Sequence, residues 1–121
     1  MKHLACSIST LALLVACQGK SYPEQSLSLP GTAARIVVTS QPYGGGPGSS
    51  YHDAYIQQGD RREAILSARS LRPIQINVTS DGSLINFKVC GGRIFKNANS
   101  SELPYGSKRP VHITAEQISC E

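Results

Sequence analysis

The sequence lacks any hydrophobic run long enough to cross a membrane as a helix. Its most apolar stretch, Leu4 to Ala16, is shorter than the about 20 residues such a helix needs, and polar side chains interrupt it. The chain also contains no Cys-x-x-Cys pair and no Gly-x-Ser-x-Gly motif. The usual sequence signs of a zinc-binding motif and of a serine hydrolase are therefore missing.

Strong charge is also missing. The 121 residues contain 12 Lys and Arg against 8 Asp and Glu, a formal net charge of +4 at pH 7. The five acidic side chains between Asp53 and Glu102 are isolated, so nothing supports paired carboxylates of the kind used in glycoside hydrolysis. A mild basic excess permits an anionic partner without requiring one.

What the sequence does contain is an unusual beginning. Met1-Lys2-His3 is followed by the apolar stretch, which ends at Leu14-Val15-Ala16-Cys17 and gives way to polar residues from Gln18. This tetrad resembles the lipobox of bacterial lipoproteins. The resemblance implies that residues 1–16 are a signal peptide, that Cys17 carries two or three acyl chains, and that these chains anchor the protein. Gln18 favours the outer membrane, with the protein facing the periplasm. The alternatives are a plain secretory signal and a buried helix of the folded domain.

The lipoprotein interpretation also assigns the cysteines. Cys6 would leave with the signal peptide and Cys17 would carry lipid, which leaves Cys90 and Cys120 in an oxidising compartment. We therefore expect a Cys90–Cys120 disulfide. A zinc site formed by these two cysteines with His52 and His112 is an alternative without supporting spacing. A nucleophilic Cys90 beside Gly91-Gly92 is another, and it requires a thiolate that the disulfide would abolish.

The remaining chain predicts a mainly β fold. Residues 17–32 are polar and predict a tether from the lipid, and 33–121 predict one small antiparallel β-sandwich-like domain. Alternating or β-branched stretches predict strands over 33–39, 51–58, 73–79, 84–90, 93–96 and 110–115. Residues 80–83 predict a hairpin turn, with Ile85, Phe87 and Val89 on one face. Residues 41–50 and 97–108 predict loops.

Residues 61–71 suit two structures. Asp60 to Glu63 resembles a capping box, and apolar side chains follow at helical spacing, which favours a short helix. The same residues form a strand if Ala64, Leu66 and Ala68 alternate inward. We favour the strand because the neighbouring segments recur at the spacing of a β-sandwich.

Two groups of residues are candidate binding residues. Arginines bind carboxylates and phosphates in a fork geometry, and four of them fall close together in the sequence: Arg61, Arg62, Arg69 and Arg72. Tyr43 and Tyr51 flank a glycine-rich loop, where tyrosines suit protein recognition. That loop lacks the Gly-Lys-Ser/Thr ending of a nucleotide-binding loop. The competing interpretations are a solvated basic surface and a tolerated loop insertion.

These observations together predict a lipid-anchored bacterial envelope protein that binds or assembles without catalysis. An accessory subunit of an envelope complex and an immunity or inhibitor protein both fit this description. The first alternative is a direct binder of lipopolysaccharide or peptidoglycan through the arginines, and the second is a small periplasmic enzyme. We expect no catalytic residues, no metal, no cofactor and no nucleic-acid partner.

Overall fold

The structure is a computed structural model that describes residues 23–42, 50–104 and 109–120. The predicted signal peptide, Cys17 and Tyr43 lie outside the described residues. Within them the chain forms only strands and connecting segments: β1 (Gln25–Ser28), β2 (Arg35–Pro42), β3 (Ser50–Gln58), β4 (Arg61–Ser70), β5 (Gln75–Val78), β6 (Leu84–Cys90), β7 (Arg93–Asn97), β8 (Ser100–Ser101) and β9 (Val111–Ile118).

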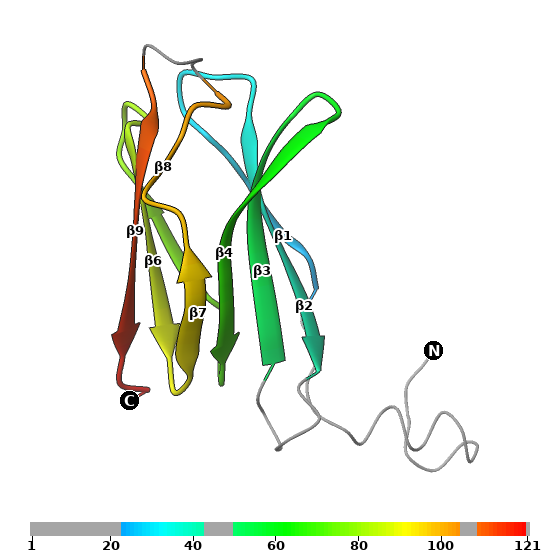
Figure 1. Cartoon of the computed structure of the whole chain (residues 1–121), viewed down its shortest axis with the longest axis vertical. Coiled ribbons are helices and arrows are strands. Elements are labelled where there is room, and N and C mark those ends of the chain that lie inside the picture. The colour runs from blue at the N-terminus through cyan, green and yellow to red at the C-terminus, as the bar shows by residue number, and fades with distance from the viewer. Residues whose placement is uncertain (1–22, 43–49, 105–108, 121) are drawn as a thin grey trace, which may run out of the picture.

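The strands form two sheets that pack face to face as a β-sandwich (Figure 1). Sheet A has the order β1-β2-β3-β4-β7 and is antiparallel throughout, whereas sheet B has the order β5-β6-β9-β8. The fold class predicted from the sequence is therefore confirmed. One pair departs from the antiparallel expectation, because β6 and β9 run parallel. Two parallel strands need a long crossover connection between them. Here the chain between β6 and β9 includes β7, which belongs to sheet A.

The core lies between the sheets and follows the predicted alternation. Ile85, Phe87 and Val89 of β6 are fully buried, as their period-two spacing predicted. They meet Ile36 and Val38 of β2 from the opposite sheet within one hydrophobic cluster. Burial of such side chains contributes about 1.5–3 kcal/mol each, so this layer is the main source of stability.

The segment with two predicted structures is a strand, β4, as favoured. Its inward face differs from the predicted one, however, because a bulge inserts Ile65 opposite β3. Leu66 and Ala68 point inward, whereas Ala64 is exposed and the prediction for it is wrong. Two adjacent buried residues, Ile65 and Leu66, break the alternation, which is why the segment also resembled a helix.

Three other expectations need correction. The tether was expected to reach residue 32, but Gln25–Ser28 pairs with β2 and Leu29 is buried in the core. An edge strand needs backbone hydrogen bonds and few apolar side chains, so its polar sequence concealed it. The loop over 97–108 contains β8, and the last strand extends to Ile118 instead of residue 115.

Candidate functional site

The four candidate arginines do not form one cluster. Arg61 and Arg62 begin β4, whereas Arg69 lies near its end and Arg72 lies just beyond it. Eight residues of extended strand separate Arg61 from Arg69, roughly 27 Å. Grouping the arginines by their proximity in the sequence was therefore wrong. The rise per residue of a strand is about twice that of a helix, so residues on a strand lie farther apart.

Arg62 is engaged within the protein. Its guanidinium carbon lies 4.7 Å from the centre of the Tyr55 ring. The same guanidinium donates hydrogen bonds to Oε1 of Gln57 at 2.7 and 3.2 Å. All three side chains lie on the outer face of sheet A, so Arg62 stiffens that face.

Arg61 lines an open cavity of about 580 Å³ at the same end of β4. Glu63, Glu102 and the buried Ser101 also line it, and the Ser101 hydroxyl donates to Glu63. Because acidic and basic groups share this cavity, it does not present the single charge sign that anion binding would need.

Arg69 lies in a different environment, beside exposed aromatic rings. Cross-strand pairing places Tyr51 on one side of Arg69 and Arg93 on the other, all facing away from the core. A second bulge, between Ser67 and Ala68, adds Phe95 to this row. We call Tyr51, Arg69, Arg93 and Phe95 the aromatic–arginine surface.

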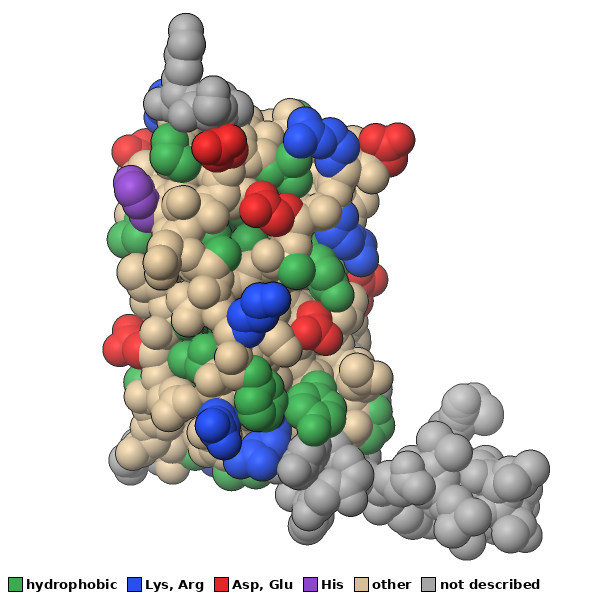
Figure 2. Space-filling view, in the orientation of Figure 1, with side chains coloured by type: hydrophobic (Ala, Val, Ile, Leu, Met, Phe, Trp, Pro, Cys, Tyr) green, Lys and Arg blue, Asp and Glu red, His purple; other side chains and the backbone are tan. Residues whose placement is uncertain are grey.

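The two rings of this surface contact each other. The ring centres of Tyr51 and Phe95 are 6.0 Å apart with a tilt of 47°, and the Arg93 guanidinium lies 5.9 Å from the Phe95 centre. Tyr51 is 36% exposed and Phe95 is 48% exposed, so two large apolar groups meet solvent together. Figure 2 shows hydrophobic and basic side chains side by side near the lower end of this face. Adjacent exposed aromatic and arginine side chains are typical of interaction surfaces.

Two residues of this surface, Tyr51 and Arg69, are among the candidates named from the sequence, in separate groups. Arg93 and Phe95 are not among those candidates. The pairing of β7 with β4 joins residues far apart in the chain, and the bulge that presents Phe95 leaves no sequence pattern. The one available signal was Phe95 itself, an aromatic residue between Arg93 and Lys96 on a short strand.

The predicted disulfide is present. Cys90 ends β6 and Cys120 follows β9, with a Cα–Cα distance of 5.0 Å. Both sulfur atoms are used in the bond, so the zinc and nucleophile alternatives lose the thiolates on which they depended. The imidazoles are also separated, because His52 is fully buried on β3 and His112 is exposed on β9. Among the described residues, no three His, Cys, Asp or Glu side chains are grouped to hold a metal ion.

His52 has a structural environment. Its Nδ1 shares a hydrogen bond of 2.8 Å with the Ser40 hydroxyl on the neighbouring strand β2. Burial lowers the pKa of His52 below its usual value, and the nearby charge of Asp53 opposes this shift only in part. Asp53 follows directly on the strand, so its side chain faces the other way. Burial inside the sandwich therefore favours the neutral form of the imidazole.

The fold and its surfaces define a small disulfide-bonded β-sandwich with a cationic aromatic surface on one sheet. Nowhere in the described part of the chain is there a helix long and apolar enough to span a membrane. Comparison with known proteins found no matching family model, no matching curated protein and no matching solved structure.

Proposed function

We propose that this protein is a lipid-anchored binding module of the bacterial envelope that holds a partner protein through the aromatic–arginine surface. The observation that carries the proposal is the contact between the half-exposed rings of Tyr51 and Phe95 beside Arg69 and Arg93. Residues of these types dominate the energy of protein interfaces when they are central and become desolvated.

The charges on this face indicate what the partner offers. Lys96 follows Arg93 on the same outer face, and neither side chain has an ion-pair partner among residues 23–42, 50–104 and 109–120. Asp53 is the acidic residue in the adjoining row of this face. A complementary partner would therefore present carboxylates around an apolar centre.

A binding role also fits the way the surface is built. Its residues are on paired strands of one sheet, so their backbone positions are fixed before any partner arrives. A surface that is already ordered loses little entropy on association. The predicted acyl chains on Cys17 would raise the local concentration of this binding module at the membrane, where the partner is expected.

The interaction is tested by capturing partners from the bacterium's own envelope with the tagged full-length chain. We expect Phe95→Ala and Arg93→Ala each to reduce the recovered partner about tenfold or more, because each removes a central contact. Arg62→Ala is the matched control, since it removes one charge from the far end of the same face. Equal loss with Arg62→Ala, or full recovery with both surface variants, contradicts the proposal.

The anchor is tested separately. Cys17→Ser removes the predicted acylation site and should move the protein from the membrane to the soluble fraction, with its unfolding midpoint unchanged. A Cys17→Ser protein that stays in the membrane fraction would exclude lipid attachment at this residue. This outcome does not depend on partner capture. The lipid anchor and the partner-binding surface are therefore tested independently of each other.

A further inference from the structure

A second basic site lies beside the disulfide. It is a cavity of about 320 Å³ lined by the disulfide and by Arg72, Pro73, Gln75, Lys88, Ile118 and Ser119. Lys88 alternates with the buried Phe87 and Val89, so it points away from the core on the outer face of sheet B. We infer that this cavity binds the phosphate group of a phosphorylated sugar.

Two cationic side chains, Arg72 and Lys88, line this cavity. Neither Arg72 nor Lys88 has an ion-pair partner within the described part of the chain. Glu116 is in register with Lys88 on β9, yet no ion pair joins the two side chains. Like charges that line one cavity repel each other, and a bound anion relieves that repulsion.

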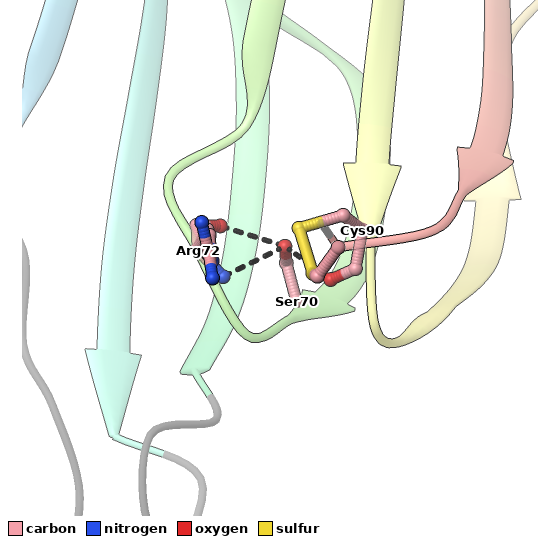
Figure 3. The surroundings of a disulfide bond; sticks show 4 residues. Ser70, Arg72 and Cys90 are labelled. Carbon is pink, nitrogen blue, oxygen red and sulfur yellow. Dashed lines mark hydrogen bonds between the residues drawn. A yellow bond between two sulfur atoms is a disulfide. The ribbon is translucent and has the colours of Figure 1, made fainter.

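The backbone of Arg72 is held in place by the Ser70 side chain. Ser70 is fully buried, and its hydroxyl lies 2.6 Å from the Arg72 carbonyl oxygen and 3.1 Å from that of Cys90. The Arg72 amide donates to the same hydroxyl at 3.3 Å. Figure 3 shows Ser70 between Arg72 and Cys90, next to the disulfide. Pro73 then restricts the following backbone, so the backbone of Arg72 is fixed at the edge of the cavity.

The charges favour phosphate over a carboxylate. A phosphate monoester carries about −1.5 to −2 at pH 7 and three acceptor oxygens, which matches one guanidinium fork and one ammonium. The Gln75 amide and the Ser119 hydroxyl add neutral hydrogen-bonding groups to the lining.

The size of the cavity indicates that the ligand is larger than phosphate alone. A volume of about 320 Å³ lies at the lower end of the range for small-molecule sites, about 300–1,000 Å³. Pro73, Ile118 and the disulfide supply apolar walls against which a sugar ring can pack. The sugar phosphate could come from solution or from the headgroup of a glycolipid.

This inference does not rest on the proposed protein-binding role, since the two sites lie on different sheets. The test is a titration of the isotope-labelled full-length protein in detergent, followed by amide chemical shifts in NMR spectra. The probes are glucose 1-phosphate, inorganic phosphate and uncharged glucose. We expect saturable shifts at Arg72, Gln75, Lys88 and Ser119 with glucose 1-phosphate, weaker ones with phosphate and none with glucose.

Variants assign the binding to the two cations. Arg72→Gln and Lys88→Gln should each weaken glucose 1-phosphate binding about tenfold, because each removes one of two charge contacts. Arg61→Gln is the matched control, since it removes the same charge at the opposite end of β4, and it should leave the affinity unchanged. Equal weakening by Arg61→Gln would mean that only net charge matters, and it would overturn the inference.

A final arm separates the two sources of the ligand. Vesicles of phosphatidylcholine doped with a phosphorylated glucosamine lipid are added to the full-length Cys17→Ser protein, which lacks the predicted acyl chains. Saturable shifts at Arg72 and Lys88 with these vesicles alone assign the site to a lipid headgroup, and shifts with glucose 1-phosphate assign it to a soluble sugar phosphate. No saturable shift with any probe overturns the inference.

Discussion

Removal of the disulfide is the perturbation whose magnitude follows most directly from the structure. The bond joins residues separated by 30 positions, from the end of β6 to the segment after β9. Closing a loop of that length lowers the entropy of the unfolded chain and stabilises the folded state by about 3–4 kcal/mol. A domain of this size is stable by about 5–15 kcal/mol in total, so the loss in Cys90→Ala/Cys120→Ala is large.

The measurement is urea unfolding of full-length protein followed by circular dichroism, in a Cys17→Ser background so that neither sample carries lipid. At a slope of about 1–2 kcal/mol per molar urea, the double variant should unfold at a midpoint lower by about 1.5–4 M. A reductant should lower the midpoint of the disulfide-containing protein to that of the variant. The same reductant should leave the variant unchanged, which serves as the control.

Equal midpoints for the two proteins would refute this reasoning. Such a result would mean that the unfolded chain already keeps β6 and β9 close, so the cross-link removes little freedom from it. A midpoint lowered by reductant in the double variant as well would assign the loss to something other than the Cys90–Cys120 bond.

Two further predictions concern stability. Gly92→Ala should lower the free energy of unfolding by about 2 kcal/mol or more in urea, because the new Cβ would lie 1.8 Å from the Arg69 carbonyl oxygen. Gly59→Ala meets no atom within 4 Å and should cost only about 1 kcal/mol, from its φ of +63°. The free energy of unfolding should also fall as the pH drops below about 6.5, because the unfolded chain protonates His52 while burial lowers its pKa in the folded state. His52→Gln should flatten this dependence and the exposed His112→Gln should not; an unchanged slope in His52→Gln would contradict the assignment.

The sequence predicted local structure well and long-range structure poorly. The hairpin of β5 and β6 and the buried face of β6 followed from alternation, which records burial on one side of a strand. The bulges at Ile65 and Phe95 and the parallel pairing of β6 with β9 depend on which strands become neighbours. No window of the sequence contains that information, so the composition of each sheet could not be predicted.

The same distinction applies to the candidate residues. The disulfide followed from counting cysteines, because two thiols in an oxidising compartment allow only one pairing. The arginines were grouped by their distance along the chain, whereas β4 separates them into residues with different surroundings. Arg62 packs on Tyr55, Arg69 lies beside Arg93, and Arg72 lines a cavity with Lys88.

The place of β9 in sheet B has a consequence for how the protein is made. β9 lies between β6 and β8, although it is the last described strand to be synthesised. Until β9 has been synthesised, β6 can pair only with β5. Phe87 of β6 then belongs to a sheet that still lacks one strand. Pairings between segments far apart in the chain also form slowly. A nascent chain that stops before Val111 would therefore expose its core and an unpaired strand edge together, so aggregation during synthesis is the hazard that this topology carries.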